Sequence, residues 1–209
     1  MQGHTELDET RIIRHIGIMA LLKIARMGHP VLHQVAEVVE DPTGAEAAAI
    51  VEDMLETLED VGGLGLAAPQ VHIPKRIVIF FVPESRTSEE ENDSPEELTI
   101  MVNPAIEYLS EEKELDWEGC LSVPDLMGSV PRYTRIRYNW TNLSGKRVNR
   151  VAIGFHARAV QHECDHLDGI LYPMRMTNFR LLGFEEEINR NPTMVKAGAA
   201  PWRDVEFDP

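Results

Sequence analysis

The sequence predicts an α+β fold, in which mixed or antiparallel β-sheets pack around one central helix within a single compact domain. Strand-like segments cluster in the middle of the chain, and two helical patterns are segregated from them, as in α+β proteins. The length of 209 residues suits one domain with a sizeable core. The hydrophobic share of 43% and the charged share of 26% are those of an ordinary soluble globular protein.

Charge and cysteine content limit the partners and the compartment. Nucleic acids and anionic membranes attract basic faces, so the net charge of −15 disfavours sequence-specific nucleic-acid binding and membrane association. The sequence contains no run of ~18 apolar residues, so no transmembrane helix is expected. Two cysteines, Cys120 and Cys164, make no disulfide framework, which favours a reducing compartment.

The two ends of the chain are expected to lie outside the main folded domain. Residues 1–18 lack the apolar core and cleavage site of a secretory signal, and we interpret them as a flexible, dispensable extension before Met19. The domain is predicted at residues 19–183. Residues 184–209 are assigned to a C-terminal tail. One short helix is possible beyond Pro173, and the Pro- and Ala-containing part that follows it is predicted to be poorly ordered.

The first helix is predicted after an extended or loosely helical segment at residues 31–40. Residues 41–43 (Asp-Pro-Thr) supply capping chemistry, and the Gly62-Gly63 pair ends the helix. We interpret this helix as core scaffold. Its apolar residues recur at helical spacing: Ala47, Ile50, Val51, Met54, Leu55, Leu58 and Val61.

The strands are predicted from apolar, β-branched segments bounded by turn residues. Residues 83–97, between the first two strands, are acidic and proline-bounded, and we interpret them as an exposed, mobile insertion; an acidic recognition loop is the alternative. A turn is predicted at residues 142–145. The strands are expected at residues 76–82, 98–103, 105–115, 132–140 and 147–153.

The helix that organises the chain is predicted at residues 156–167, closed by Gly169. It contains the pattern HExxH, in which His162 and His166 are four residues apart and share one face. Two such imidazoles can hold one metal ion, and Glu163 then acts as general base to a metal-bound water. The alternative is a chance match on a polar helix. Cys164 falls on the opposite, apolar face with Val160 and Leu167, where it packs.

Cys120 lies between a glycine and a strand-like segment. A lone cysteine is more often a small buried hydrophobe than a ligand. If Cys120 shares a cavity with His162 and His166, one thiolate and two imidazoles leave a fourth position for water, which is the catalytic arrangement. A metal there lowers the pKa of that water towards ~7, and Glu163 can take its proton.

Residues 63–71 (GLGLAAPQV) combine glycines, small residues and a proline. Such a segment lets the backbone approach a ligand or another element closely. A phosphate loop is the alternative, but the segment follows a helix and lacks the third glycine of the dinucleotide fingerprint.

Three motifs together resemble the peptide deformylases: GLGLAAPQ at residues 63–70, EGCLSVP at residues 118–124 and QHECDHLDG at residues 161–169. Their order and spacing match that family, and the resemblance covers residues 24–183. It implies a metal-dependent hydrolase that removes the formyl group from the N-terminal formyl-methionine of new polypeptides. In that reaction a metal-bound water attacks the formyl carbon, with Glu163 as general base and then acid.

The resemblance also implies roles for the remaining motif residues. The Gln70 side-chain amide and the Leu121 backbone N–H are the two donors to the developing oxyanion. Glu118 pairs with Arg132 to steady the cysteine loop, unless this is a surface pair that contributes little. Substrate-binding residues are Gly63, Leu64, Gly65, Glu118 and Gly119, the first three as an edge partner of the peptide backbone, and the metal ligands are Cys120, His162 and His166.

The expected cofactor is one divalent metal ion per chain. The ligand set accepts iron, zinc, nickel or cobalt, and the resemblance implies iron(II). Expected partners are nascent formyl-methionine peptides, with transient ribosome contact, in a bacterial cytoplasm rather than an organelle.

The chain departs from common members of the family at several places. Arg158 faces the same side as His162, where many bacterial members carry an apolar pocket residue, and Met127 stands where some carry an arginine. The C-terminal tail lacks a long basic helix. Two alternative functions are an HExxH metallopeptidase, whose third ligand would need to come from beyond His166 where no histidine follows, and an inactive metal- or peptide-binding module.

Overall fold

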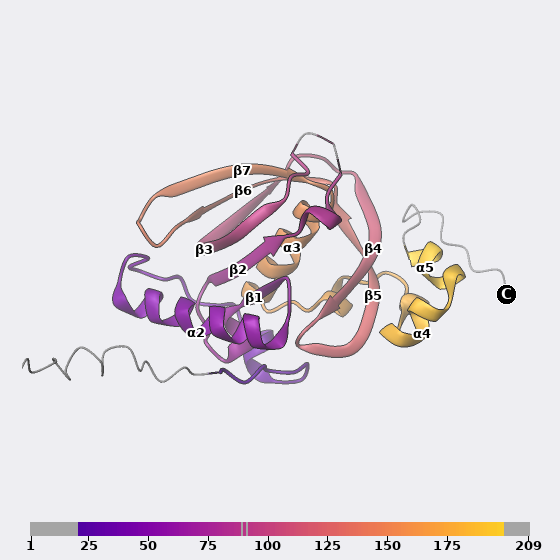
Figure 1. Cartoon of the computed structure of the whole chain (residues 1–209), viewed down its shortest axis with the longest axis horizontal. Helices are drawn as coiled ribbons and strands as arrows, with labels where there is room; N and C mark the ends of the chain where they lie inside the picture. Colours follow the sequence, from indigo (N-terminus) through magenta and orange to yellow (C-terminus); the bar gives the residue numbers. More distant parts are fainter. Residues whose placement is uncertain (1–20, 89, 91, 199–209) are drawn as a thin grey trace, which may run out of the picture.

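The computed structural model describes residues 21–88, 90 and 92–198. The predicted extension at residues 1–18, Met19 and the last residues of the predicted tail, 199–209, lie outside the described residues. Within the described part, two antiparallel sheets of five and three strands lie on either side of helix α3 (Gly154–Leu167) (Figure 1). The predicted α+β class, with sheets around a central helix, is confirmed.

The larger sheet has the strand order β1-β2-β3-β6-β7, and all of its neighbouring strands are antiparallel. Of the strands that the structure describes, β1 therefore lies at the edge, and its second side pairs with none of them. The bounds are Gly65–Ala67 for β1, Ile77–Val82 for β2, Glu96–Tyr108 for β3, Arg135–Thr141 for β6 and Arg147–Ile153 for β7.

Strand β2 is buried on both faces because helices cover the sheet from both sides. Val78 and Phe80 join the core that includes the apolar face of α3, whereas Ile77 and Ile79 join the core formed with α2 (Ala45–Val61). Successive side chains of a strand point to opposite faces, so an apolar run rather than an alternating pattern is required here. Each fully buried side chain of this size contributes about 1.5–3 kcal/mol.

Helix α2 ends as predicted but begins differently. Gly62 adopts a left-handed conformation (φ 71°) and its N–H donates to the Leu58 carbonyl at 3.0 Å, which closes the helix. At the other end the N-cap is Gly44, without a side-chain cap. The Asp41 carboxylate instead accepts from the Thr43 N–H at 2.9 Å, so the predicted capping residues form a turn before the helix.

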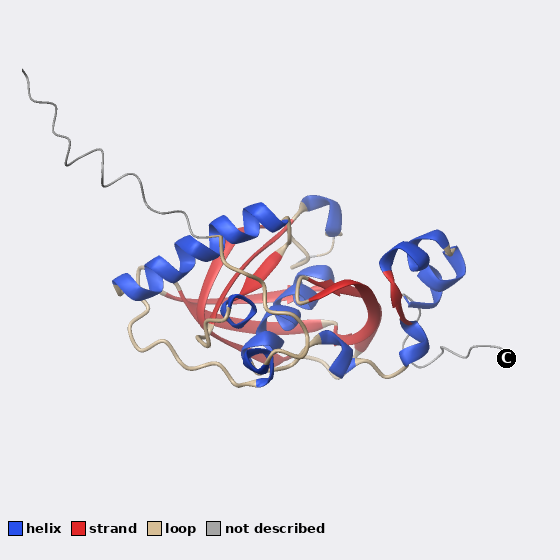
Figure 2. Cartoon of the chain, turned by 90° about the horizontal axis from the view of Figure 1, so that it is seen from below, coloured by secondary structure: helices blue, strands red, loops and turns tan. Residues whose placement is uncertain are grey.

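The smaller sheet has the order β4-β5-β8, with β4 at Lys113–Cys120, β5 at Val123–Tyr133 and β8 at Leu182–Phe184. Helices α4 (Glu185–Arg190) and α5 (Pro192–Gly198) follow β8, and Figure 2 shows them gathered at the end of the molecule away from α2. The Trp117 indole donates to the Val195 carbonyl at 3.0 Å, and the Ser129 hydroxyl donates to the Gly198 carbonyl at 2.6 Å. Helix α4 confirms the short helix expected beyond Pro173, whereas the prediction of a poorly ordered tail is wrong for residues 192–198.

Most predicted strands are confirmed, and the errors lie where two strands meet. The strands at residues 76–82, 98–103 and 147–153 and the turn at 142–145 are present. The predicted strand at 105–115 is wrong because the chain turns between Tyr108 and Lys113, and the one at 132–140 spans the end of β5 and most of β6. The connecting 3-10 helices are η1 Pro30–His33, η2 Ala68–Val71, η3 Glu84–Arg86, η4 Tyr172–Arg175 and η5 Phe179–Leu181.

The acidic insertion at residues 83–97 packs partly onto helix α3 instead of remaining solvated. Asp93 is buried, accepts from the Ser88 N–H at 2.8 Å, and lies so close to Gly154 that an added Cβ there would be 2.8 Å from its carboxylate. A carboxylate at this end of α3 complements the positive end of the helix dipole. Arg86 stacks 4.0 Å from the centre of the Phe155 ring. Among the described residues, no helix is long and apolar enough to cross a membrane.

Candidate metal centre and active site

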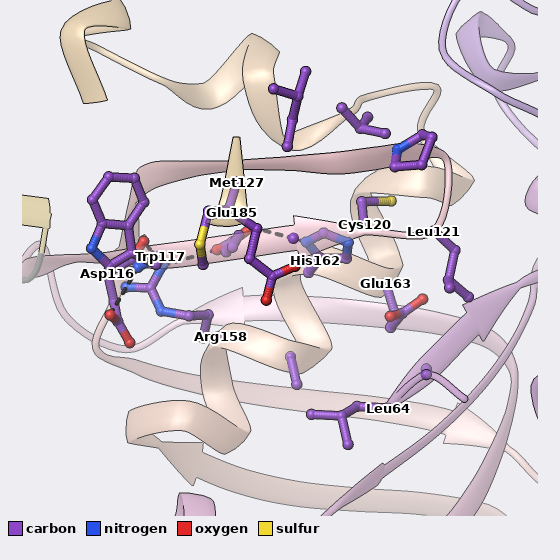
Figure 3. A pocket seen from close by; sticks show the side chains of 18 of the residues that line it. Leu64, Asp116, Trp117, Cys120, Leu121, Met127, Arg158, His162, Glu163 and Glu185 are labelled. Atoms are coloured by element: carbon purple, nitrogen blue, oxygen red, sulfur yellow. Dashed lines mark hydrogen bonds and ion pairs between the residues drawn. The ribbon is translucent and has the colours of Figure 1, made fainter. Parts of the chain in front are cut away.

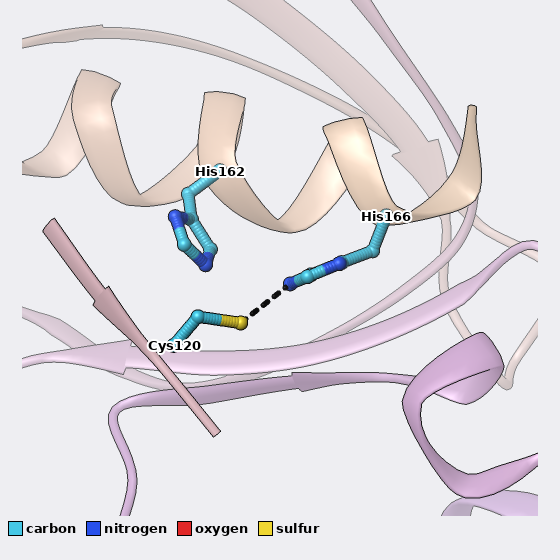
Figure 4. Close-up of side chains that lie close together, drawn as sticks. All are labelled: Cys120, His162 and His166. Carbon is cyan, nitrogen blue, oxygen red and sulfur yellow. Dashed lines mark hydrogen bonds between the residues drawn. The ribbon is translucent and has the colours of Figure 1, made fainter. Parts of the chain in front are cut away.

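The two histidines of the HExxH pattern lie on one face of α3, as the spacing predicts. Their ring centroids are 5.0 Å apart and the rings are nearly perpendicular. The opposite face, with Val160, Cys164 and Leu167, is buried against the larger sheet, as predicted. Helix α3 therefore presents both imidazoles away from that sheet, towards the β4–β5 hairpin (Figure 4).

Cys120 ends β4 at the tip of that hairpin and completes the group. Its Sγ lies 3.3 Å from the Nε2 atom of His166, and ligand atoms of Cys120, His162 and His166 all lie within 4.8 Å of one another. Sulfur and nitrogen ligands of one tetrahedral metal ion are about 3.5 Å apart, given metal–ligand bonds of ~2.0–2.3 Å. The three predicted ligands are thus brought together at a spacing that fits a metal ion.

The protonation of the group also fits a metal ion. Burial opposes ionisation of the Cys120 thiol, but the imidazoles of His166 and His162 outweigh it and hold the pKa of this thiol well below its ordinary value. For His162, burial lowers the pKa, whereas hydrogen bonds to Cys120 and Glu118 raise it well above its ordinary value. The site therefore stabilises a thiolate beside positive charge, and a divalent cation satisfies the same demand.

Glu118 contacts His162 on the ring nitrogen that does not face the proposed metal position. Its Oε2 atom lies 2.9 Å from the Nδ1 atom of His162, which leaves Nε2 of that ring for a metal. Arg132 binds both oxygens of Glu118 through Nε and NH2 at 2.8 Å each, and both side chains are about 95% buried. The predicted Glu118–Arg132 pair is confirmed, and the surface-pair alternative is wrong.

The same arginine continues the charge network to helix α3. Arg132 donates to Asp165 at 2.5 Å, and Asp165 also binds the half-exposed Arg175 at 2.7 Å. Breaking a buried pair of this kind costs about 3–5 kcal/mol, because it leaves one charge without a partner. The network therefore fixes β4, β5 and α3 relative to one another.

Glu163 extends from α3 into the cavity beside the three ligands. It is only 7% exposed, and among the described residues its Oε2 atom has no hydrogen-bond partner. Burial raises the pKa of this carboxyl, and the imidazoles of His162 and His166 offset the shift only in part. A buried carboxylate with a raised pKa and an open acceptor suits proton transfer.

Gly65 allows Glu163 to occupy this position. A Cβ added at Gly65 would lie 2.3 Å from the Glu163 Oε1 atom and 2.7 Å from its carboxyl carbon. The Gly65→Ala substitution is therefore expected to push the carboxylate out of place and lower kcat/KM by about 10²-fold, a typical cost of a 1 Å misplacement. Steady-state kinetics measures the loss of kcat/KM, and urea unfolding shows whether the variant has also lost stability. Gly183→Ala is the control, because its added Cβ makes ordinary 3.4 Å contacts. Unchanged kinetics in Gly65→Ala would contradict the steric role.

Gln70, in η2, is held with its amide group aimed at the cysteine. Its Oε1 accepts from the Ala67 N–H at 2.9 Å, while its Nε2 donates to Ser122 Oγ at 3.2 Å and lies 3.5 Å from Cys120 Sγ. Leu121 stands between Cys120 and Ser122 in the hairpin tip. Sequence reasoning missed Ser122, which is fully buried and orients the amide.

A cavity of about 670 Å³ opens beside this group. Figure 3 shows Cys120, His162 and Glu163 in one part of it and Arg158, Asp116 and Trp117 in another. All the predicted catalytic and substrate-binding residues line it: Gly63, Leu64, Gly65, Gln70, Glu118, Gly119, Leu121 and Glu163. The carboxylate of Glu118 is already bound by protein groups, so this residue supports the site and does not offer a free side chain to a substrate.

Several residues of the cavity wall were missed from the sequence. Arg86 comes from the insertion, Phe155 from the start of α3 and Glu185 from the C-terminal helix α4. No local motif marks them, because they reach the cavity only through tertiary contacts. The positively charged Arg86 within an acidic segment was the one available signal.

Known proteins share both the sequence and the fold. The family model described as Polypeptide deformylase matches residues 21–181. Peptide deformylase 1 of Nitrosomonas europaea is 44% identical over 172 residues, which cover 82% of this chain and 97% of the relative. Peptide deformylase 2 of Ralstonia nicotianae is 47% identical over 163 residues, which cover 78% of this chain and 91% of the relative.

Solved structures of similar proteins agree with the fold. A crystal structure of peptide deformylase from Ehrlichia chaffeensis in complex with actinonin has a TM-score of 0.71 at 32% identity, covering 83% of this chain and 99% of that chain. The Met-Ala-Ser-bound class I type b peptide deformylase from Acinetobacter baumannii has a TM-score of 0.66 at 37% identity, covering 75% and 99%.

Proposed function

The chain belongs to the peptide deformylase family, and from this premise we propose which residues carry out its reaction. The protein is a metallo-hydrolase that removes the N-formyl group from nascent peptides. One observation supports this assignment most strongly. Cys120, His162 and His166 come together beside Glu163, whose buried Oε2 atom has no hydrogen-bond partner among the described residues.

Cys120, His162 and His166 would hold one divalent metal ion, which we propose to be iron(II) in the cell. Zinc, nickel or cobalt suits the same ligands. When bound, the metal supplies a Lewis-acidic charge that makes water a nucleophile near neutral pH. The thiolate character of Cys120 and the Glu118–His162 hydrogen bond support this ligand set.

Glu163 moves the proton. Its free Oε2 accepts a proton from the attacking water and then delivers it to the amide nitrogen as the bond between the formyl carbon and that nitrogen breaks. The products are formate and a peptide with a free amino terminus. The raised pKa of Glu163 favours both halves of this transfer, because the carboxyl can hold the proton between the two steps.

Gln70 and Leu121 would stabilise the negative charge that develops on the formyl oxygen. The Gln70 amide is fixed by Ala67 and Ser122, and its second N–H is directed at Cys120 Sγ, next to the place where the formyl oxygen would bind. The Leu121 backbone N–H lies in the hairpin tip next to the same cysteine. Donors that are already oriented contribute more than donors that must reorganise.

The peptide backbone would lie along the edge strand β1 and the two residues before it, Gly63 and Leu64. Strand β1 pairs with β2 on one side only, so its other side can accept an additional strand. Gly119 also lines the cavity. The methionine side chain would occupy the part of the cavity next to Met127 and Phe155.

The two other functions considered from the sequence are not supported. An HExxH metallopeptidase would need a third ligand beyond His166, whereas Cys120 occupies that role in space. A module that only binds metal or peptide does not need a buried carboxylate oxygen that is left without a partner among the described residues, as Glu163 Oε2 is. We further propose that the protein works in a bacterial cytoplasm with transient ribosome contact, and that residues 19–183 carry the catalytic domain, whose cavity Glu185 completes.

The test is release of formate from formyl-Met-Ala-Ser by protein purified without oxygen, with metal content measured on the same sample. Acetyl-Met-Ala-Ser is the control substrate. Close to one metal ion per chain with turnover of the formyl peptide alone is the expected result. Bound metal without turnover would support the inactive module instead, and cleavage of internal peptide bonds would support the metallopeptidase.

A further inference from the structure

Arg158 lines the cavity, and its guanidinium is buried between helix and hairpin. It is 6% exposed, and its NH1 donates to Glu118 Oε1 and to the Val130 carbonyl, each at 2.8 Å. Its NH2 donates to the Glu114 carbonyl at 2.8 Å. The guanidinium thus bridges helix α3 to both strands of the hairpin that carries Cys120.

Glu118 links this arginine to a metal ligand. Oε1 of Glu118 is shared by Arg132 and Arg158, and Oε2 accepts from Arg132 and contacts Nδ1 of His162. Two arginines from different elements therefore fix both the position and the rotation of one carboxylate. A planar guanidinium fork constrains geometry in a way that a single point charge does not.

The positions along the chain make this contact relevant to the metal centre. Arg158 precedes His162 by one helical turn on α3, and Glu118 precedes Cys120 by two residues on β4, so both pairs lie on the same side of their elements. The Arg158–Glu118 contact therefore joins the two elements close to where each presents a ligand. By contrast, among the described residues, Nδ1 of His166 has no hydrogen-bond partner. His162 is the ligand with carboxylate support.

We propose that Arg158 is a positioning residue for His162, which acts through Glu118 to fix the orientation of that ring and its spacing from Cys120. This inference rests on the metal site proposed above. Two other roles for Arg158 are a determinant of the methionine pocket, because its stem lines the cavity, and a general link between helix and hairpin. Both terminal nitrogens of Arg158 already donate to protein oxygens, which argues against a role in binding the methionine side chain.

The test compares metal release from Zn(II)-loaded wild type, Arg158→Met and Arg158→Lys, measured with a chromogenic chelator in excess. Methionine keeps the apolar stem and removes the charge and donors, and lysine keeps the charge without the fork. Arg76→Met is the matched control, because Arg76 binds Asp168 at 2.7 Å and the Leu167 carbonyl at 3.2 Å near the other end of α3 without touching Glu118. Urea unfolding of each variant reports stability separately.

Zinc release is expected to be 10–100-fold faster from Arg158→Met, the usual effect of losing support behind a ligand, with Arg158→Lys intermediate and Arg76→Met within about twofold of wild type. The visible spectrum of the Co(II)-loaded Arg158→Met protein should shift, because the ligand geometry changes. If Arg158→Met fails to fold, the release rate of Arg158→Lys decides.

Three results would overturn the inference. Equal release rates in wild type and the Arg158 variants, with KM for formyl-Met-Ala-Ser raised, would make Arg158 a pocket determinant. Equal acceleration in Arg158→Met and Arg76→Met would make it a general structural link. A wild-type protein that fails to retain one zinc ion per chain would overturn the proposed metal site itself, which the first two results leave intact.

Discussion

Replacement of Glu163 by alanine is expected to lower kcat/KM for a formyl-methionine peptide by about 10³-fold, within the range of general acid–base catalysis. The metal content should remain near one ion per chain, because Glu163 is not among the three clustered ligand residues. The carboxylate is buried beside those residues, and within the described part of the chain its Oε2 has no hydrogen-bond partner, so its loss removes the proton acceptor without breaking a described hydrogen bond at that atom.

Formate release and metal analysis on the same preparation check this prediction. Glu163→Gln is the informative companion, because it keeps the volume and removes the base, and it should be equally inactive. A Glu163→Ala enzyme with near-wild-type turnover would refute the assignment of the proton-transfer role. Loss of metal in both variants would instead make Glu163 part of the metal-binding group.

Replacement of Cys120 by serine is expected to weaken metal binding by more than the 10–100-fold typical of residues behind the ligands. The two imidazoles hold the pKa of the Cys120 thiol well below its ordinary value, and this thiolate supplies the negative charge of the site. A serine hydroxyl has the same shape but stays protonated, so the two histidines alone would remain as ligands. Turnover should fall with metal content.

Metal titration with a competing chelator measures the effect. Cys164→Ala is the matched control, because this second cysteine lies in the core on the other face of α3, and burial raises the pKa of its thiol above the ordinary value. That variant should lose some stability and keep one metal ion per chain. Equal metal affinity in Cys120→Ser and wild type would exclude Cys120 as a ligand.

The proposed catalytic residues could be predicted because they lie in short local motifs. His162, Glu163 and His166 are fixed relative to one another by helix geometry alone, and the structure places the helix from residue 154 to 167, against a predicted 156–167. Gly65 was predicted to permit close approach, and the structure supplies the partner, the carboxylate of Glu163.

The parts that could not be predicted depend on contacts between distant segments. Asp93 is buried within a segment whose composition favours solvent, because the positive end of α3 lies beside it. Residues 184–198 fold because β8 pairs with β5 and α5 packs against Trp117 and Ser129. Composition predicted an exposed, mobile insertion at residues 83–97 and a poorly ordered end of the tail, and composition carries no information about such partners.

The sequence by itself determined the family and the α+β class, and it predicted the Cys/His/His group and the residue proposed for proton transfer, because each follows from residue types at fixed local spacing. The tertiary structure alone decided what surrounds them. It binds the guanidinium of Arg158 to Glu118 at the cavity wall and brings Arg86 and Glu185 to the same wall. The physical reason is that side-chain direction and burial depend on which elements pack together, and packing is a property of the whole chain.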